Sequence, residues 1–283
     1  MCGIRGEILL ESDVSAYRVD KSSSSGAPNH GYSEIKELDL LVPNIDLATG
    51  CSPAFLAGQP PSTLAQSLST RIYTLLHSSN LIDLEDLRIL YRAPVIPTGM
   101  EDELANEEAV KIAQQEVKGF WTLYIDVVFI SLDGNPFDAA WAAVVSALRD
   151  VKLPYSYWDN DLQMILCSDE VSRSKKLNLH GLPIACTYAV FQAKERQSQV
   201  RHGEKGEANY WILADPDTFE ESQCEEAVTI VVDCTQQGEE TRVLEILKSG
   251  GSIIGRVKMR ELVETAAKRW REWYEVFTTG KVS

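Results

Sequence analysis

The pattern of apolar and polar positions is clearest in the middle of the chain. Residues 120–133 are mostly β-branched and aromatic, which is typical of a largely buried strand. Gly134 and Asn135 suit a turn, and Pro136 fits a first helical turn, where a missing N–H costs little. The Ala-rich run that follows, up to Leu148, places its large apolar residues on one helical stripe: Phe137, Trp141, Val144, Val145 and Leu148. The pattern therefore predicts a strand, a tight turn and a helix.

Such a unit can present backbone N–H groups and the positive end of a helix dipole to a phosphate. The turn at 134–137 contains no Lys, Arg, Ser or Thr that could hold the phosphate. The sequence thus predicts a catalytic type of scaffold that lacks the side chains for the chemistry.

Elsewhere the periodicity predicts two further helices, from Pro61 or Ser62 to His77 and from about 256 to 277. Residues 84–89 are predicted to be short and extended. Strands are expected at 2–11, 36–42, 162–168, 183–193, 209–214, 226–234 and 241–247. This order of strands and helices favours an α+β fold, with mixed β-sheets packed on helices.

Three polar or acidic stretches read as exposed insertions, near residues 12–34, 92–108 and 194–208. We interpret 1–283 as one domain with these insertions. An apolar content of 44% is sufficient for a proper core.

Charge and cysteine content argue against several functions. A net charge of −15 argues against a protein that binds nucleic acid on its own, because such a protein normally shows a basic face. The six cysteines are scattered, which favours reduced core residues over disulfides or a metal site. The chain has no segment apolar enough to span a membrane and no visible signal peptide.

The strand-turn-helix unit resembles the core of the RNase PH family. In active members the turn carries Gly-Thr-Arg, and that Thr and Arg hold the inorganic phosphate used in phosphorolysis of RNA. Here Asn135, Pro136 and Phe137 stand in their place. Because phenylalanine cannot replace a guanidinium fork that binds phosphate at two points, the resemblance implies a degenerate turn without catalytic residues.

Four further segments resemble the non-catalytic ring subunits of the eukaryotic RNA exosome within that family: 38–55, 176–191, 210–216 and 248–255. The resemblance covers 2–11 and most of 36–277, and it implies an RNase PH-like fold built from β-α-β-α units. Residues 1–10 resemble a strand well inside the family's domain, so the N-terminal part of that domain is expected to be absent. A sheet without its first strands would expose an unpaired edge.

The resemblance implies a structural subunit rather than an enzyme, with no cofactor or metal of its own. Its implied partners are other RNase PH-like ring subunits, cap proteins with S1 and KH domains, and RNA in the assembled channel, with no membrane involved. The implied location is the nucleus and nucleolus, and also the cytoplasm. Arg71, Lys175 and Lys176 are candidate RNA contacts. Each also has an ordinary interpretation, as a helix-surface arginine or as solvated lysines.

Two other functions remain open at this point. The chain could be a phosphate-dependent 3'-to-5' exoribonuclease whose site is rearranged or shared with a neighbour. It could also bind RNA alone, although its net charge argues against this.

Overall fold

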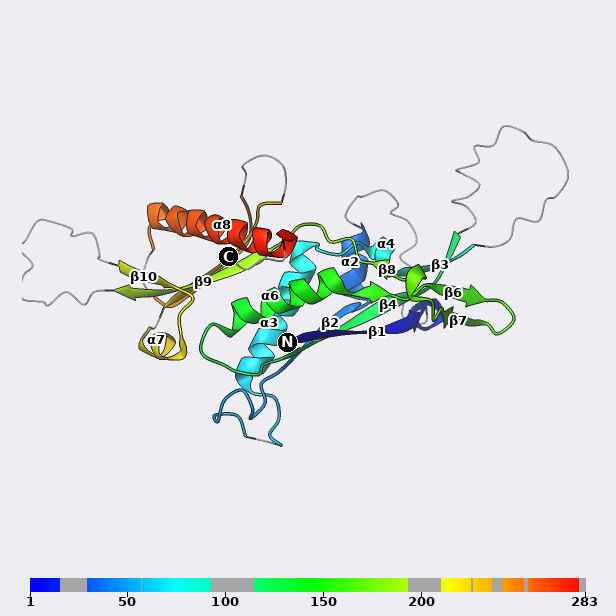
Figure 1. The fold of residues 1–283 in the computed structure, drawn as a ribbon, viewed down its shortest axis with the longest axis horizontal. Coiled ribbons are helices and arrows are strands. Elements are labelled where there is room, and N and C mark those ends of the chain that lie inside the picture. Colours follow the sequence, from blue (N-terminus) through cyan, green and yellow to red (C-terminus); the bar gives the residue numbers. More distant parts are fainter. Residues whose placement is uncertain are drawn as a thin grey trace, which may run out of the picture.

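Two larger sheets, one mixed and one antiparallel, make up the framework of the described part of the chain, with helices between and beside them (Figure 1). The computed structural model describes residues 1–15, 30–56, 58–92, 115–192, 210–224, 226–235, 241–251 and 254–279. These residues confirm the predicted α+β class with mixed sheets packed on helices.

The first sheet is organised around one long strand, β4 (Gln115–Val128). It pairs antiparallel with β1 (Cys2–Leu10) and β3 (Arg88–Arg92), and parallel with β2 (Leu41–Asp46). Because β2 is parallel to β4, the polypeptide has to cross over before it returns, and α3 (Thr63–Ser79) lies in that connection, packed on β2.

The second sheet is antiparallel throughout, in the order β10-β9-β11-β12. Its strands are β9 (Ile184–Gln192), β10 (Tyr210–Ala214), β11 (Ala227–Asp233) and β12 (Arg242–Ser249).

Helix α6 (Pro136–Asp150) lies between the two sheets, where it contacts β9 on one side and β1 and β4 on the other. Helix α8 (Arg256–Thr279) covers the opposite face of the second sheet (Figure 1). Two buried tryptophans join these helices to one segment before β9. The indole N–H of Trp141 donates to Pro183 O (2.9 Å), and that of Trp270 donates to Leu182 O (2.6 Å).

Short elements fill the remaining connections. The helices are α1 (Glu11–Ser15), α2 (His30–Glu37), α4 (Leu84–Leu87), α7 (Thr218–Gln223) and the 3₁₀ turn η1 (Val171–Arg173). The strands form two small pairs at the end of the molecule opposite α7: β5 (Lys152–Leu153) with β8 (Lys175–Lys176), and β6 (Ser156–Asp159) with β7 (Met164–Cys167).

The three long helices confirm their predictions. So do the strands expected at 2–11, 162–168, 183–193, 209–214, 226–234 and 241–247, each to within two residues at either end. The strand predicted at 36–42 is wrong: helix α2 runs to Glu37, a turn with Asp39 in the left-handed region (φ 48°) follows, and β2 begins at Leu41. The extended segment predicted at 84–89 is wrong in its first part, because residues 84–87 are helical.

The strand predicted to run to residue 133 ends at Val128, because after that residue the chain leaves the sheet to make the turn into α6. Most of each predicted insertion lies outside the described residues, within the ranges 16–29, 93–114 and 193–209. None of the helices in the described ranges is long and apolar enough to cross a membrane.

Candidate functional site

The turn between β4 and α6 has an uncommon backbone, which explains its sequence. Gly134 and Asn135 both lie in the left-handed region, with φ of 82° and 41°. A β-carbon at position 134 would lie 2.4 Å from the carbonyl oxygen of Pro216, so glycine is required there for space as well as for conformation. Pro136 then begins α6, as the sequence predicts.

Asn135 connects this turn to the loop after β10. Its side-chain amide donates to Asp138 Oδ2 (2.9 Å) and to Asp215 Oδ1 (2.7 Å), and its backbone N–H donates to Glu221 Oε1 (2.9 Å). The residue is buried. A helix N-terminus that would otherwise offer free N–H groups to an anion is therefore partly occupied by the protein's own carboxylate, that of Glu221.

Asp138 forms the centre of a buried hydrogen-bond network. The backbone N–H and the hydroxyl of Thr187 donate to its two oxygens at 2.7 Å each, and Thr187 is hydrogen-bonded in turn to Thr229 (2.9 Å). Burial raises the pKa of the Asp138 carboxyl, while the hydrogen bonds from Asn135 and Thr187 act in the opposite direction. Because it already accepts hydrogen bonds from Asn135 and Thr187 inside the protein, this carboxylate joins α6 to β9 rather than facing a ligand.

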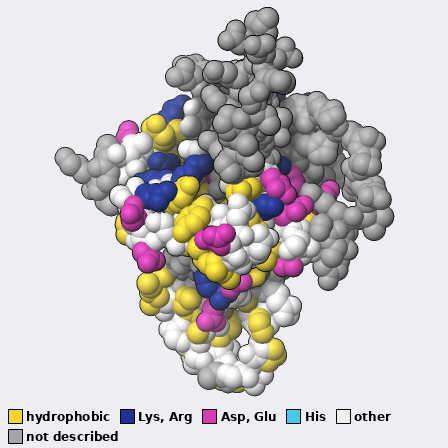
Figure 2. All heavy atoms as spheres, turned by 90° about the vertical axis from the view of Figure 1, so that its right-hand side faces the viewer, with side chains coloured by type: hydrophobic (Ala, Val, Ile, Leu, Met, Phe, Trp, Pro, Cys, Tyr) yellow, Lys and Arg dark blue, Asp and Glu magenta, His cyan; other side chains and the backbone are white. Residues whose placement is uncertain are grey.

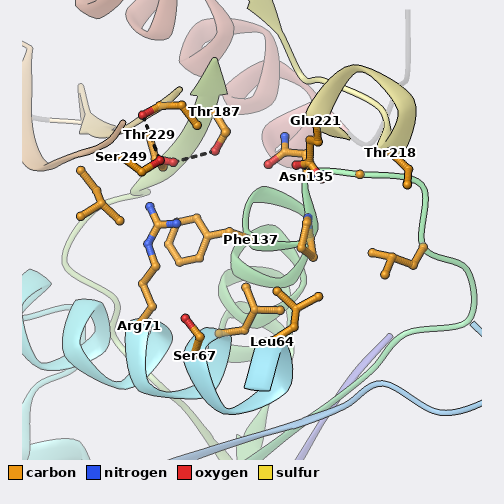
Figure 3. Close-up of a pocket in the computed structure, with 16 residues that line it drawn as sticks. Leu64, Ser67, Arg71, Asn135, Phe137, Thr187, Thr218, Glu221, Thr229 and Ser249 are labelled. Carbon is orange, nitrogen blue, oxygen red and sulfur yellow. Dashed lines mark hydrogen bonds between the residues drawn. The ribbon is translucent and has the colours of Figure 1, made fainter. Parts of the chain in front are cut away.

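Arg71 reaches the same site from α3. Its guanidinium carbon lies 3.5 Å from the centre of the Phe137 ring (Figure 3). Its Nε is 3.5 Å from Glu245 Oε1 on β12. Nε and one terminal nitrogen are buried without a hydrogen-bond partner among the described residues. Burial lowers the pKa of Arg71, and Glu245 opposes this effect. Phe137 and Glu245 thus hold this cation on two sides.

Arg71, Asn135 and Phe137 line a pocket of about 410 Å³ between α3, α6, α7 and the second sheet (Figure 3). Its polar lining consists mainly of hydroxyl groups, from Ser67, Thr187, Thr218, Thr229 and Ser249. Among the described side chains that line it, Arg71 is the one basic and Glu221 the one acidic residue, and none is His, Cys or Lys. The pocket can therefore accommodate a ligand by shape and hydroxyl contacts, and its one carboxylate, that of Glu221, accepts a hydrogen bond from the Asn135 N–H.

The structure brings four of the predicted site residues together. Asn135, Pro136, Phe137 and Arg71 all line this pocket. The other two candidates lie elsewhere: Lys175 and Lys176 form β8, near the opposite end of the molecule.

Lys175 has a specific partner there, since its ammonium group is 2.5 Å from Asp86 Oδ1. Asp86 is 7% exposed and also accepts from the backbone N–H of Asn178 (2.7 Å). An ion pair with the protein itself is thus the interpretation that fits Lys175. Lys176 is exposed.

Sequence reasoning missed several residues of the site. Asp138 could have been found, because it is an acidic residue on the apolar stripe of α6, three residues before Trp141. A capping box between Asp217 and Glu220, which starts α7, was also visible as Asp-x-x-Glu. The role of Glu245 could not be predicted from the sequence, because it depends on which helix packs beside β12.

The described residues contain no group of three or more His, Cys, Asp or Glu side chains that could hold a metal ion. The described cysteines are all free thiols. Burial raises the pKa of Cys186, on β9, to about 12, so its thiol is protonated and unreactive at neutral pH.

Comparison with known proteins identifies related chains. Residues 18–154 match the model of a family described as RNase_PH, 3' exoribonuclease family, domain 1. Exosome complex component rrp43 of Schizosaccharomyces pombe is 29% identical over 270 residues, which are 95% of this chain and 74% of that protein. Exosome complex component Rrp42 of Archaeoglobus fulgidus is 22% identical over 250 residues, or 88% and 74% of the two chains.

Two solved structures share the fold. A chain of the Archaeoglobus fulgidus exosome with RNA bound to the active site superposes with a TM-score of 0.55 and 19% identity, covering 96% of this chain and 78% of that one. A chain of an archaeal exosome core superposes with a TM-score of 0.52 and 18% identity, covering 97% and 76%. The fold is therefore RNase PH-like, as the resemblance in the sequence implies.

Proposed function

We propose that this chain, which carries an RNase PH domain, is a subunit of an RNA exosome ring and does not itself cleave RNA. Its role is structural: it assembles with other RNase PH-like subunits, contacts cap proteins with S1 and KH domains, and supports 3'-to-5' processing and decay of RNA in the assembled channel. It acts in the nucleus and nucleolus, and in the cytoplasm. The whole chain, 1–283, serves as one domain in this assembly.

One observation carries the catalytic half of the proposal. The single basic residue among the described side chains that line the pocket, Arg71, is stacked on Phe137 and paired with Glu245. A phosphate would have to displace Glu245 and bind against an aromatic ring instead of a second cation. Phosphate binding relies on charge-assisted hydrogen bonds from several donors, so this pocket is poorly suited to hold the attacking phosphate of phosphorolysis.

The structural half rests on similarity. A relative named as an exosome component aligns with 95% of this chain, and the fold is that of chains from solved exosomes. A protein with a net charge of −15 is also better suited to pass RNA along a channel completed by partners than to bind it alone.

Tagging the chain in its native cells tests the structural half. We expect it to co-purify in stoichiometric amounts with other RNase PH-like subunits and S1/KH-domain proteins, at one defined particle size. Recovery as a monomer or a homo-oligomer would contradict the proposal.

A phosphorolysis assay tests the catalytic half. The purified chain, and the complex with whichever RNase PH-like neighbour it binds, are incubated with single-stranded RNA and inorganic phosphate. Nucleoside diphosphates are then measured, with and without Arg71→Gln in this chain. We expect no product that depends on Arg71, whereas phosphate-dependent release that this substitution abolishes would establish the enzyme alternative.

A further inference from the structure

The small hairpin β6–β7, at the end of the molecule seen in Figure 2, has two unlike faces. Successive side chains of a strand point to opposite sides, so Tyr157 and its cross-strand partner Leu166 share one face, and Trp158 and Ile165 share the other.

The face with Trp158 and Ile165 packs inward on the first sheet. The side chain of Ile165 lies so close to Gly119 on β4 that a β-carbon there would be 2.8 Å from its Cδ1. The ammonium group of Lys118 lies 5.1 Å from the centre of the Trp158 ring. This packing fixes which way the opposite face of the hairpin points.

The opposite face carries an exposed row of planar groups. Tyr155 and Tyr157 are 42% and 39% exposed, and their ring centres are 6.1 Å apart with the planes inclined by only 25°. The guanidinium carbon of Arg173, in η1, lies 4.0 Å from the centre of the Tyr155 ring. Arg173, Tyr155 and Tyr157 thus form one exposed row of planar groups, which we call the Arg-Tyr-Tyr row.

Basic side chains lie beside this row. Lys152 and Lys176 are directly paired across β5 and β8, close in the chain to Tyr155 and Arg173, and both are exposed. Figure 2 shows Lys and Arg side chains gathered next to hydrophobic ones on this end of the molecule. Residues 152–176 contain four basic and four acidic residues, so this segment is neutral in a chain whose net charge is −15.

We propose that the Arg-Tyr-Tyr row is a binding site for single-stranded RNA, on which successive bases stack while Lys152 and Lys176 contact the adjoining phosphates. The proposal deepens the exosome role proposed above and rests on it for the identity of the nucleic acid. The site is separate from the pocket at Arg71, because none of Tyr155, Tyr157 and Arg173 lines that pocket.

The chemistry favours RNA over a protein partner. Exposed tyrosine rings and arginine planes are the groups on which unpaired bases stack, and the stacking tolerates any base sequence. Two lysines on the flank match a phosphate backbone. Protein–protein interfaces are enriched in tyrosine and arginine, as this row is, but they are depleted of lysine, and two lysines lie close to these rings in the chain.

Iodouridine crosslinking tests the proposal on the full-length chain. A single-stranded oligouridine with 5-iodouridine is bound to the chain, irradiated, and the crosslinked peptide is identified by mass spectrometry, with affinity measured in parallel. We expect the crosslink at Tyr155 or Tyr157. The double substitution Tyr155→Leu and Tyr157→Leu is expected to weaken binding by roughly 10-fold or more, which is the scale of losing a base-stacking contact.

Two controls separate stacking from other effects. The double substitution of the same residues by Phe keeps both rings and is expected to retain affinity within about 2-fold, since stacking does not need the hydroxyl. Phe219→Leu removes a ring that is 71% exposed on α7, at the other end of the molecule, and is expected to change nothing. If the Leu and wild-type chains bind the oligouridine equally, or the crosslink maps elsewhere, the proposal is wrong.

The salt dependence adds a quantitative check. With two phosphate contacts, the slope of log K against log salt is expected to be roughly −1.4 for a single strand. The double substitution Lys152→Gln and Lys176→Gln should remove most of this dependence of binding on salt. An unchanged slope would overturn the assignment of the two lysines.

Failure of this proposal can be told apart from failure of the exosome role. The Leu variant is also tagged in cells and its recovery in the particle is measured. A variant that no longer joins the particle, but binds RNA like the wild type, would show that the row is a protein interface. A wild-type chain that binds RNA through the row but is absent from any particle would refute only the exosome role.

Discussion

Two arginines in this molecule make the same contact in opposite surroundings. Arg71 stacks on Phe137 at 3.5 Å, and Arg173 stacks on Tyr155 at 4.0 Å. Phe137 is 3% exposed and Tyr155 is 42% exposed. The geometry alone therefore does not say what a cation–π contact is for. Burial decides whether the stacked pair is part of the protein's interior or a surface that a ligand can use.

The charged groups near Arg71 and near Arg173 also differ. Glu245 pairs with Arg71, whereas Arg173 forms no ion pair within the described ranges of the chain. A buried guanidinium needs a counter-charge because its desolvation is costly, while an exposed one keeps its water. Arg71 is thus part of the protein's interior, whereas Arg173 in η1 is available to a ligand.

The largest expected difference between the two regions is in stability. Phe137→Ala should lower the free energy of unfolding by about 3–5 kcal/mol, because it opens a cavity in the interior beneath Arg71. Tyr155→Ala, at the exposed stack, should change it by less than about 0.5 kcal/mol. Urea unfolding of the two variants and the wild type measures both values. Similar losses for both would mean that the two stacks have the same structural role.

A smaller effect is expected from removing the counter-charge. Glu245→Gln leaves a partly buried guanidinium without its carboxylate and should cost about 1–3 kcal/mol. It should also make the thermal midpoint rise with inorganic phosphate more steeply than in the wild type, because the freed cation can then bind an anion. Thermal unfolding over a phosphate series measures both effects.

Glu7→Gln is the matched control for this experiment. Glu7 is also 3.5 Å from an arginine, Arg5, but the two side chains are 52% and 63% exposed. Its loss should cost at most about 0.5 kcal/mol and should leave the phosphate response unchanged. A Glu245 variant that behaves like this control would show that the pocket does not sequester Arg71.

The smallest effect is expected from His77, which lies on α3 like Arg71. Both ring nitrogens are buried without a hydrogen-bond partner among the described residues, and the ring packs 4.3 Å from that of Tyr73. Burial lowers the pKa of His77, and nearby Lys36 lowers it further while Asp39 opposes this. The unfolded chain therefore binds a proton at this residue at higher pH than the folded chain does.

The contribution of neutral His77 to the free energy of unfolding is therefore fully present above the unfolded pKa of about 6.5. It is lost progressively as the pH falls below that value. His77→Phe should flatten the stability profile between about pH 7.5 and 5.5, measured by urea unfolding at each pH. If the variant and the wild type lose stability in parallel, burial does not control the titration of this residue.

Much of the fold could be predicted because local pattern and tertiary role agree. The stripe from Phe137 to Leu148 became the buried face of α6, and the apolar run at 226–234 became a strand of the second sheet. Prediction failed where local pattern was misleading. The chain around Leu38 and Asp39 contains strand-forming residues, but Asp39 adopts a left-handed turn that ends α2 and delays β2 to Leu41.

The site was predictable only in part, for a related reason. Asn135, Pro136 and Phe137 could be singled out because they are adjacent in the chain and depart from the pattern of the family that the unit resembles. Glu245 could not, because it lies far along the chain from Arg71 and meets it only once β12 has paired with β11 at the edge of the second sheet. Tyr155 and Arg173 were missed as a pair because their contact depends on the pairing of the small strands β5 and β8, which flank them in the chain.

The close approach at Gly134 limits which substitutions this chain can accept during evolution. The turn before α6 and the loop after β10 touch with no room for a single methyl group, although they are about 80 residues apart in the sequence. A substitution in one is accepted only if the other shifts to make space, so the two segments have to diversify together. Homologous chains with another residue at this position are expected to differ in the length or path of the loop at Pro216. An alignment of sequences alone would show the two positions changing together.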